Sequence, residues 1–151
     1  MPGGAAGRSR EPGARIVLDD DEYCFCCGPR NPIGLKLRFR ESEGGGMSTV
    51  WTPKKEHQGF KDIVHGGLVA TVLDEVMVRL LYHVGIRAVT ATMETKLVKP
   101  VRWGRSYRFE GRIVEDRRRA VITEAEAFDA ESGERAAWGR ATCVRVESPT
   151  T

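Results

Sequence analysis

Apolar residues recur with a helical period in the middle of the chain, directly after a histidine and two glycines. These positions are Leu68, Val69, Val72, Leu73, Val76, Met77, Leu80 and Leu81. The i, i+1, i+4, i+5 spacing fits a helix with one broad buried face and does not fit a strand. We therefore predict a helix over residues 66–84, about 27 Å long, with Gly85 as its terminator.

Most of the remaining chain alternates apolar and polar residues, which is the pattern of strands with one buried face. Leu35, Leu37 and Phe39, for example, alternate with basic residues ahead of a glycine turn at residues 44–46. We predict strands at residues 35–40, 47–52, 89–98, 107–114, 120–128 and 136–146. One long helix against roughly six antiparallel strands is an α+β fold.

Length and composition favour a single small domain, which we place at residues 16–147 of the 151. Residues 1–15 are rich in Gly, Pro, Ala and Arg and are expected to form a disordered tail, and residues 148–151 a short second tail. No stretch approaches the roughly 18 apolar residues of a membrane span, and the N-terminus has no apolar signal core. We therefore expect a cytoplasmic protein that does not contact membranes.

The basic residues do not suggest a nucleic-acid partner. The net charge is only +3, and the arginine run at residues 117–119 is interleaved with Glu115 and Asp116. No stripe of stacking aromatics accompanies these residues.

The start of the predicted helix carries the first candidate chemistry. Gly66 and Gly67 follow His65, and without Cβ atoms they leave the first backbone N–H groups of the helix open to a ligand. The helix dipole makes this end positive, so a developing anionic oxygen would be stabilised there.

Two adjacent carboxylates in the helix are the second candidate for chemistry. Asp74 and Glu75 lie just beyond the two opposite edges of the apolar face. Glu75 has Arg79 four residues later and is expected to form a surface ion pair. Asp74 has Ala70, Met77, Val78 and Leu81 as its helical neighbours. A carboxylate beside such apolar groups is often functional. Asp74 is therefore the candidate catalytic residue.

Four short segments appear in a recognisable order. They are Cys24-Phe25-Cys26-Cys27-Gly28 with Asn31-Pro32 and Gly34-Leu35, then His65-Gly66-Gly67, then Asp74 nine residues after the histidine, and then Lys99-Pro100-Val101. With these segments the chain resembles the hotdog-fold acyl-CoA thioesterases, particularly the PaaI-like (phenylacetyl-CoA thioesterase) branch, over about residues 23–146. The resemblance implies a hotdog fold, in which a long antiparallel sheet wraps the central helix.

The resemblance also implies an activity and roles for individual residues. The substrate would be an acyl-CoA thioester, with Asp74 as base or nucleophile and the Gly66 amide as oxyanion donor. No metal and no cofactor is implied apart from the coenzyme A of the substrate. The site would form between subunits of a homodimer or a dimer of dimers, with Asp74 from one subunit and the His65–Gly66 corner from the other. An exposed sheet face and edge independently favour self-association.

Several supporting roles have two interpretations. His65 would either anchor its loop or hydrogen-bond the thioester, and Gln58 is the candidate to position water. On the strand after the helix, Thr90 and Thr92 are both candidates to assist Asp74, and we favour Thr90. Both threonines are also ordinary strand formers.

Arg102 and Arg105 follow the strand and also have two interpretations. Their guanidinium groups could bind the phosphates of coenzyme A, or they could belong to a solvated turn. Cys24 and Cys27 have the spacing of a zinc ligand pair. A structural zinc site needs four ligands, however, and Cys143 has no second cysteine beside it, so we expect buried, inert thiols.

Two other functions compete with hydrolysis. A hotdog domain could bind acyl-CoA without catalysis, and it would then retain the intact ligand. A hydratase would need a histidine working with Asp74, but the nearest downstream histidine, His83, is about 13 Å along the same helix on another face. The length and chemistry of the acyl group cannot be read from the chain.

Overall fold

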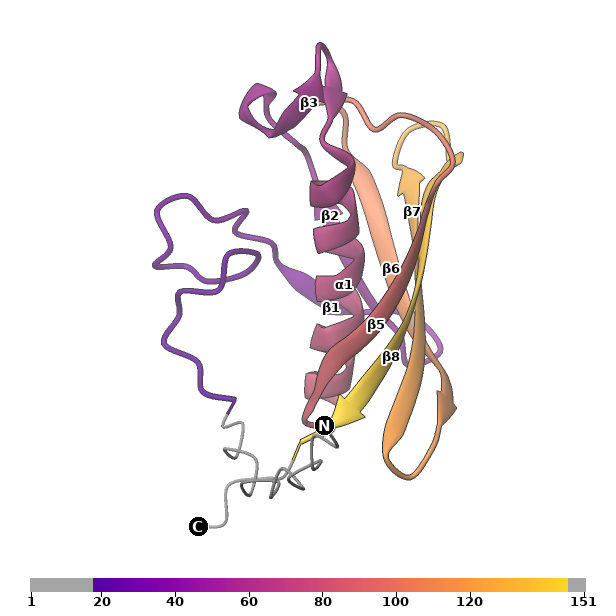
Figure 1. Ribbon diagram of the computed structural model, residues 1–151. Helices are drawn as coiled ribbons and strands as arrows, with labels where there is room; N and C mark the ends of the chain where they lie inside the picture. The colour runs from indigo at the N-terminus through magenta and orange to yellow at the C-terminus, as the bar shows by residue number, and fades with distance from the viewer. Residues whose placement is uncertain (1–17, 147–151) are drawn as a thin grey trace, which may run out of the picture.

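The computed structural model describes residues 18–146, so the predicted tails at residues 1–15 and 148–151 lie outside the described residues. One helix, α1 (Gly66–His83), runs through the centre of the fold (Figure 1). His65 caps its N-terminus, and Gly85, with a φ of 84°, follows its C-terminus as predicted. No helix among the described residues has the length and apolar character to cross a membrane.

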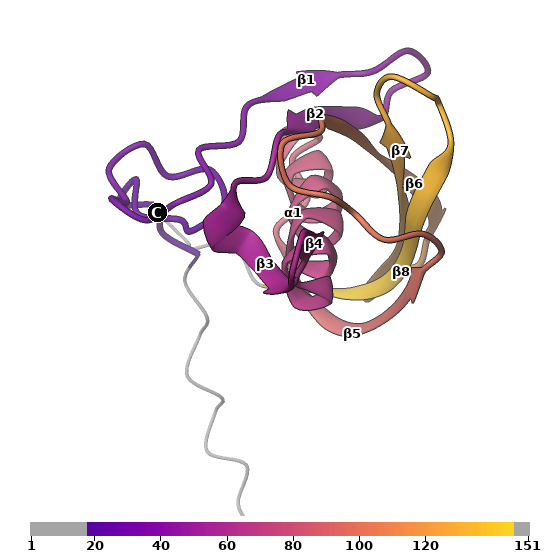
Figure 2. The same cartoon turned by 90° about the horizontal axis from the view of Figure 1, so that it is seen from above.

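An antiparallel sheet of six strands wraps this helix. The strands are β1 (Phe39–Glu41), β2 (Met47–Trp51), β5 (Ala88–Leu97), β6 (Tyr107–Asp116), β7 (Ala120–Asp129) and β8 (Arg135–Arg145). Their order across the sheet is β1-β2-β6-β7-β8-β5. Viewed from above in Figure 2, the sheet curves around three sides of α1, and the indigo N-terminal segment lies on the fourth. This is the predicted α+β hotdog fold, one helix packed against six antiparallel strands.

The buried face of α1 is the one that the spacing of apolar residues predicted. Its buried residues are Val69, Val72, Leu73, Val76, Met77, Leu80 and Leu81. Gly111 of β6 allows the sheet to approach the helix closely, because a Cβ there would lie 3.2 Å from the backbone oxygen of Val76. This close packing sets the distance between the helix and the sheet, and with it the positions of the polar side chains of the helix.

The first predicted strand is wrong at its beginning. Residues 35–38 do not pair with a strand; instead the Leu35 and Leu37 N–H groups donate to the carbonyl oxygens of Phe25 and Cys26. Lys36, between them, has a left-handed φ of 53°. The alternation of apolar residues at this point reflects packing against the cysteine loop, and the strand itself begins only at Phe39.

The segment between β2 and α1 contains elements that the sequence analysis did not predict. A short 3-10 helix, η1 (Lys55–His57), leads into a small hairpin of β3 (Gln58–Phe60) and β4 (Ile63–Val64). In Figure 1 this hairpin lies beyond the N-terminal end of α1. The end of η1 holds His65 in place, because the His65 N–H donates to the His57 carbonyl oxygen at 2.8 Å.

Candidate active site

Asp74 and Thr90 form a direct hydrogen bond between helix and sheet. The Thr90 hydroxyl, on β5, donates to the Asp74 carboxylate at 2.6 Å, and both side chains are half-buried. The buried Cys143 sulfur lies 3.9 Å from the same hydroxyl. The bond satisfies one of the carboxylate's lone pairs, and Asp74 retains oxygen lone pairs for another partner.

A β-bulge decides which of the two candidate threonines meets Asp74. Thr90 pairs with Cys143 and Thr92 with Thr142, so Ala91 is an extra residue in β5. After the bulge, Thr92 is exposed, and within the described residues its hydroxyl has no hydrogen-bond partner. Thr90 is thus the threonine in contact with Asp74.

Asp74 faces a hollow of about 500 Å³ between α1, β5 and the N-terminal loop. Thr90 and Val89 line it from the sheet, Glu75 and Tyr82 from the helix, and Cys24 and Cys27 from the loop. The hollow is therefore built from both apolar and ionisable groups, with the carboxylate of Asp74 at its wall.

The glycines at the start of α1 line a second hollow, of about 410 Å³. Its other walls are largely apolar and include Phe60, Leu97 and Val98, all of which are exposed. The Gly67 N–H donates to the Nδ1 atom of His65 at 3.0 Å, so His65 is the helix cap. The Gly66 N–H has no acceptor within residues 18–146 and remains available at the positive end of the helix.

Within one chain, these two hollows are separate. Gly66 and Asp74 are eight residues apart on the same helix, which corresponds to about 12 Å along its axis. No residue lines both hollows. A single thioester group cannot contact both residues of the same chain.

Comparison with known families identifies the superfamily of this chain. Residues 61–136 match the family described as Thioesterase superfamily, which is half of the chain. The chain belongs to the thioesterase superfamily. The match includes the His65-Gly66-Gly67 segment, Asp74, Thr90 and Arg102. A search of curated proteins found no match.

Several solved structures have the same fold. One is smu.793 from Streptococcus mutans UA159 bound to acetyl CoA, with a TM-score of 0.69 at 18% sequence identity. The match covers 76% of this chain and 91% of that one. A hypothetical thioesterase with coenzyme A from Streptococcus pneumoniae TIGR4 has a TM-score of 0.69 at 14% identity, covering 76% and 88%. E. coli PaaI, from the phenylacetic acid degradation operon, has a TM-score of 0.70 at 14% identity, covering 78% and 84%. The pneumococcal protein has also been solved with a threonine changed to alanine and with an aspartate changed to alanine.

Gln58 lies outside the part that matches the thioesterase superfamily, and its side chain has a local task. Its Oε1 atom accepts from the Asp62 N–H at 3.2 Å and holds the turn between β3 and β4. Asp62 has a φ of 65° in this turn. Gln58 therefore supports the hairpin that carries His65.

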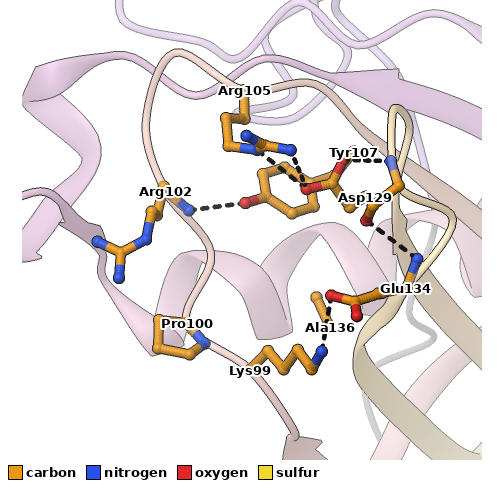
Figure 3. A pocket seen from close by; sticks show the side chains of 9 residues that line it. Lys99, Pro100, Arg102, Arg105, Tyr107, Asp129, Glu134 and Ala136 are labelled. Carbon is orange, nitrogen blue, oxygen red and sulfur yellow. Dashed lines mark hydrogen bonds and ion pairs between the residues drawn. The ribbon is translucent and has the colours of Figure 1, made fainter.

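Arg102 lines a third hollow, which has a volume of about 320 Å³ (Figure 3). Its backbone N–H donates to the Tyr107 hydroxyl at 2.9 Å. Arg105 is bound to Asp129 at 2.9 Å and 2.7 Å, and Lys99 to Glu134 at 2.7 Å. The Arg102 guanidinium extends away from the Arg105–Asp129 pair in Figure 3 and has no acidic partner within the described residues.

The electrostatics of this third hollow distinguish Arg102 from Arg105. Backbone N–H groups of Ser132 and Glu131, followed by the Arg105 guanidinium, lower the pKa of Asp129. The hydrogen bond to Asp129 in turn raises the pKa of Arg105. The Arg105 charge is thus already neutralised, whereas that of Arg102 is free to meet an anion.

The predicted ion pair between Glu75 and Arg79 is wrong. The Arg79 guanidinium lies over the rings of Phe39 and Tyr82, 5.4 Å and 5.9 Å from their centroids. Glu75 instead faces the N-terminal loop, where the Cys24 thiol approaches its carboxylate at 3.7 Å. The helix spacing allowed the pair, but the neighbouring aromatic rings hold the arginine.

The grouping of two cysteines with Glu75 was not predicted from the sequence. The ligand atoms of Cys24, Cys27 and Glu75 all lie within 4.8 Å of one another. Burial, and then the charge of Glu75, raise the pKa of Cys27 to about 12. The spacing of Cys24 and Cys27 was visible in the sequence, but no sequence signal joined them to a helix residue about 50 positions later.

Proposed function

We propose that this chain hydrolyses an acyl-CoA thioester to a free acid and coenzyme A. The observation that carries the proposal is the half-buried Asp74 carboxylate, oriented by Thr90 at 2.6 Å, on the wall of a hollow in a thioesterase-superfamily scaffold. Two proteins of similar fold were solved with acetyl CoA or coenzyme A. The two residues changed to alanine in the pneumococcal protein, an aspartate and a threonine, are sixteen positions apart, like Asp74 and Thr90.

Asp74 supplies the attack on the thioester carbonyl carbon. As a base, it takes a proton from water while the water oxygen bonds to that carbon; as a nucleophile, its own oxygen bonds to the carbon and water releases the acid afterwards. In both routes the carbon–sulfur bond breaks, and the thiolate of coenzyme A leaves and takes up a proton. Both routes require an ionised carboxylate at this position.

The Gly66 N–H stabilises the negative charge that develops on the carbonyl oxygen. Its hydrogen-bonding capacity is unused within the described residues, while His65 occupies the Gly67 N–H next to it. A fixed donor at the positive end of a helix binds the oxyanion more strongly than the neutral carbonyl, and therefore raises the rate. His65 thus acts by capping the N-terminus of α1, and the Gly67 N–H donates to this cap and does not bind substrate.

The active site is shared between two copies of the chain. Asp74 and Gly66 of one chain are about 12 Å apart along α1, too far to contact one thioester. Pairing two chains with their helices side by side would bring Asp74 of one protomer to Gly66 of its partner. We therefore propose a homodimer as the smallest active unit, alone or within a dimer of dimers.

The charged end of coenzyme A is bound by Arg102. Its guanidinium is free of acidic partners in the described chain, and a planar guanidinium matches two phosphate oxygens at once. The acyl group would lie against the apolar walls provided by Phe60, Leu97 and Val98.

Thiol release from a panel of acyl-CoA substrates, from short aliphatic through long-chain to aromatic, tests the proposal. We expect wild-type protein to release free coenzyme A from at least one member, and Asp74→Asn to lower that turnover by about 10²- to 10⁴-fold. Glu43→Gln, which neutralises an exposed carboxylate in the turn between β1 and β2, is the control.

Two outcomes would contradict the proposal. Full turnover by Asp74→Asn would exclude Asp74 as base and as nucleophile. Tight binding of acyl-CoA by the wild-type protein, without thiol release from any substrate, would assign the chain to non-catalytic acyl-CoA-binding modules instead.

A further inference from the structure

Three metal-ligating side chains meet at one point of the hollow that contains Asp74. Cys24 and Cys27 come from the N-terminal loop and Glu75 from α1, and their ligand atoms lie within 4.8 Å of one another. All three residues are partly buried and line the hollow. The cluster therefore joins two parts of the chain that are distant in sequence.

The loop is folded tightly enough to hold both thiols in place. The Gly28 N–H donates to the Cys24 carbonyl oxygen at 2.8 Å, which closes the turn around the two cysteines. A Cβ at residue 28 would lie 2.3 Å from the Cys24 backbone nitrogen, so only glycine fits. The Leu35 and Leu37 N–H groups anchor the same loop to Phe25 and Cys26. The two sulfur atoms are thus positioned by backbone contacts.

Glu75 has no cation to neutralise it within the described residues. Arg79 lies over aromatic rings, and the Glu75 carboxylate accepts a weak hydrogen bond from the Cys24 thiol at 3.7 Å. A half-buried carboxylate beside two thiols is an unfavourable arrangement unless a cation joins them.

We propose that Cys24, Cys27 and Glu75 together bind one Zn²⁺ ion. Two thiolates and one carboxylate suit zinc, because the soft sulfur ligands disfavour Mg²⁺ and Ca²⁺. On binding, each thiol loses its proton to solvent, so two protons are released for each ion bound. Three protein ligands would leave a fourth position for water or another ligand. This inference does not depend on the proposed function, and it replaces the sequence-based expectation of inert thiols.

The ion ties the cysteine loop to α1 beside Asp74. Without it, the polar link between the loop and Glu75 is one long hydrogen bond from a thiol, whereas three coordinate bonds would fix the loop as one wall of the hollow. Zinc removal therefore loosens the loop while leaving the sheet and helix core in place.

Metal binding by the full chain tests the proposal directly. Reduced protein, freed of metal by a chelator that is then removed, is titrated with Zn²⁺ in competition with a coloured chelator, and separately with Co²⁺. We expect one Zn²⁺ per chain, and a near-ultraviolet thiolate-to-cobalt absorption band that Zn²⁺ abolishes. Mg²⁺ should neither bind nor displace cobalt.

Matched variants locate the site. Loss of an outer-shell partner weakens metal binding by about 10- to 100-fold, so removal of a ligand in Cys24→Ser, Cys27→Ser or Glu75→Gln should weaken it by at least about 100-fold. Cys26→Ala, in the same loop but buried in the core, and Cys143→Ala, on β8, should retain the ion and the cobalt band. Circular dichroism checks the fold of each variant.

The proposal fails if reduced wild-type protein binds no Zn²⁺ and shows no cobalt–thiolate band. It also fails if folded Glu75→Gln binds zinc as tightly as wild type, because the carboxylate would then not be a ligand. Zinc-dependent protection of Cys24 and Cys27 from alkylation supports it without any substitution, and equal alkylation with and without zinc contradicts it.

Discussion

At the residue scale, the surroundings of Asp74 explain why a carboxylate is retained beside apolar neighbours. The Thr90 hydroxyl gives it one strong hydrogen bond at 2.6 Å, and the hollow gives it access to a second partner. Charge-assisted bonds of this kind hold a carboxylate oxygen in one orientation. A reacting carboxylate needs that fixed orientation, because misplacement reduces the rate steeply.

Thr90→Val tests the contribution of this bond. Valine has nearly the same shape but cannot donate, so the Asp74 carboxylate loses a hydrogen bond worth at least about 1.5 kcal/mol. We expect thioester turnover to fall by about tenfold. Thr90→Ser, which keeps a hydroxyl, should retain most of the wild-type rate. Equal turnover by the valine and serine variants in a thiol-release assay would show that the bond does not support catalysis.

The sequence identified Asp74 but could not choose between Thr90 and Thr92. Asp74 was distinguishable because Ala70, Met77 and Val78 surround it on the helix and none of them can pair with a carboxylate, which is a local property of the helix. The threonine that faces it depends on the extra residue at Ala91, and a bulge is set by the pairing of β5 with β8. Pairing between distant strands is not visible in a local pattern. The same limitation hid the contact of Glu75 with the cysteine loop.

At the scale of elements, the two glycines at the N-terminus of α1 differ. The Gly67 N–H donates to the Nδ1 atom of His65, whereas the Gly66 N–H has no acceptor within the described residues. The His57 carbonyl oxygen at the end of η1 holds the His65 backbone. This division of the two N–H groups can be tested because Gly66 is the first residue of the helix, where proline is well tolerated.

Gly66→Pro and Gly66→Ala form a matched pair. Both variants crowd Leu97, whose side chain would lie 2.7 Å from an added Cβ, but only proline removes the N–H. His65 already has a ψ of 125°, which suits the residue before a proline. We expect kcat to fall by about 10²- to 10³-fold in Gly66→Pro and to change far less in Gly66→Ala. A similar kcat for the two variants would remove the Gly66 N–H from the mechanism.

The contact between α1 and β6 depends on a second glycine. A Cβ on Gly111 would meet the rigid backbone of Val76 at 3.2 Å, whereas one on Gly139 would meet the flexible end of Met93 at the same distance. We therefore expect Gly111→Ala to lower the free energy of unfolding by about 1 to 3 kcal/mol and Gly139→Ala to lower it less. Urea denaturation measures both values. A larger loss in Gly139→Ala would contradict the packing described for α1.

The long elements and the five-residue β2 were predictable, whereas the other short elements were not. The boundaries of α1 and of β5 to β8 agree with the predicted ranges to within two residues, because each has a sustained apolar period. The segment at residues 35–38 alternates in the same way but packs against the cysteine loop. The η1 helix and the β3–β4 hairpin are too short to show a period, although they position His65.

At the scale of the whole molecule, the proposed reaction requires two copies of the chain. One chain has a carboxylate in one hollow and a free helix N–H in another, about 12 Å apart along α1. In the proposed symmetric pair, each Asp74 would meet the Gly66 of the other protomer, so two equivalent sites would form. Variants that damage different halves of the site should therefore complement each other when their chains pair.

Co-expression of Asp74→Asn and Gly66→Pro chains, each with a different affinity tag, tests this claim most directly. Random pairing makes about half of the dimers mixed, and each mixed dimer contains one intact site of two, so activity should recover to about a quarter of the wild-type value. Purification through both tags should raise it to about half. Thioesterase activity of the doubly purified protein no higher than that of either variant alone would contradict a site shared between protomers.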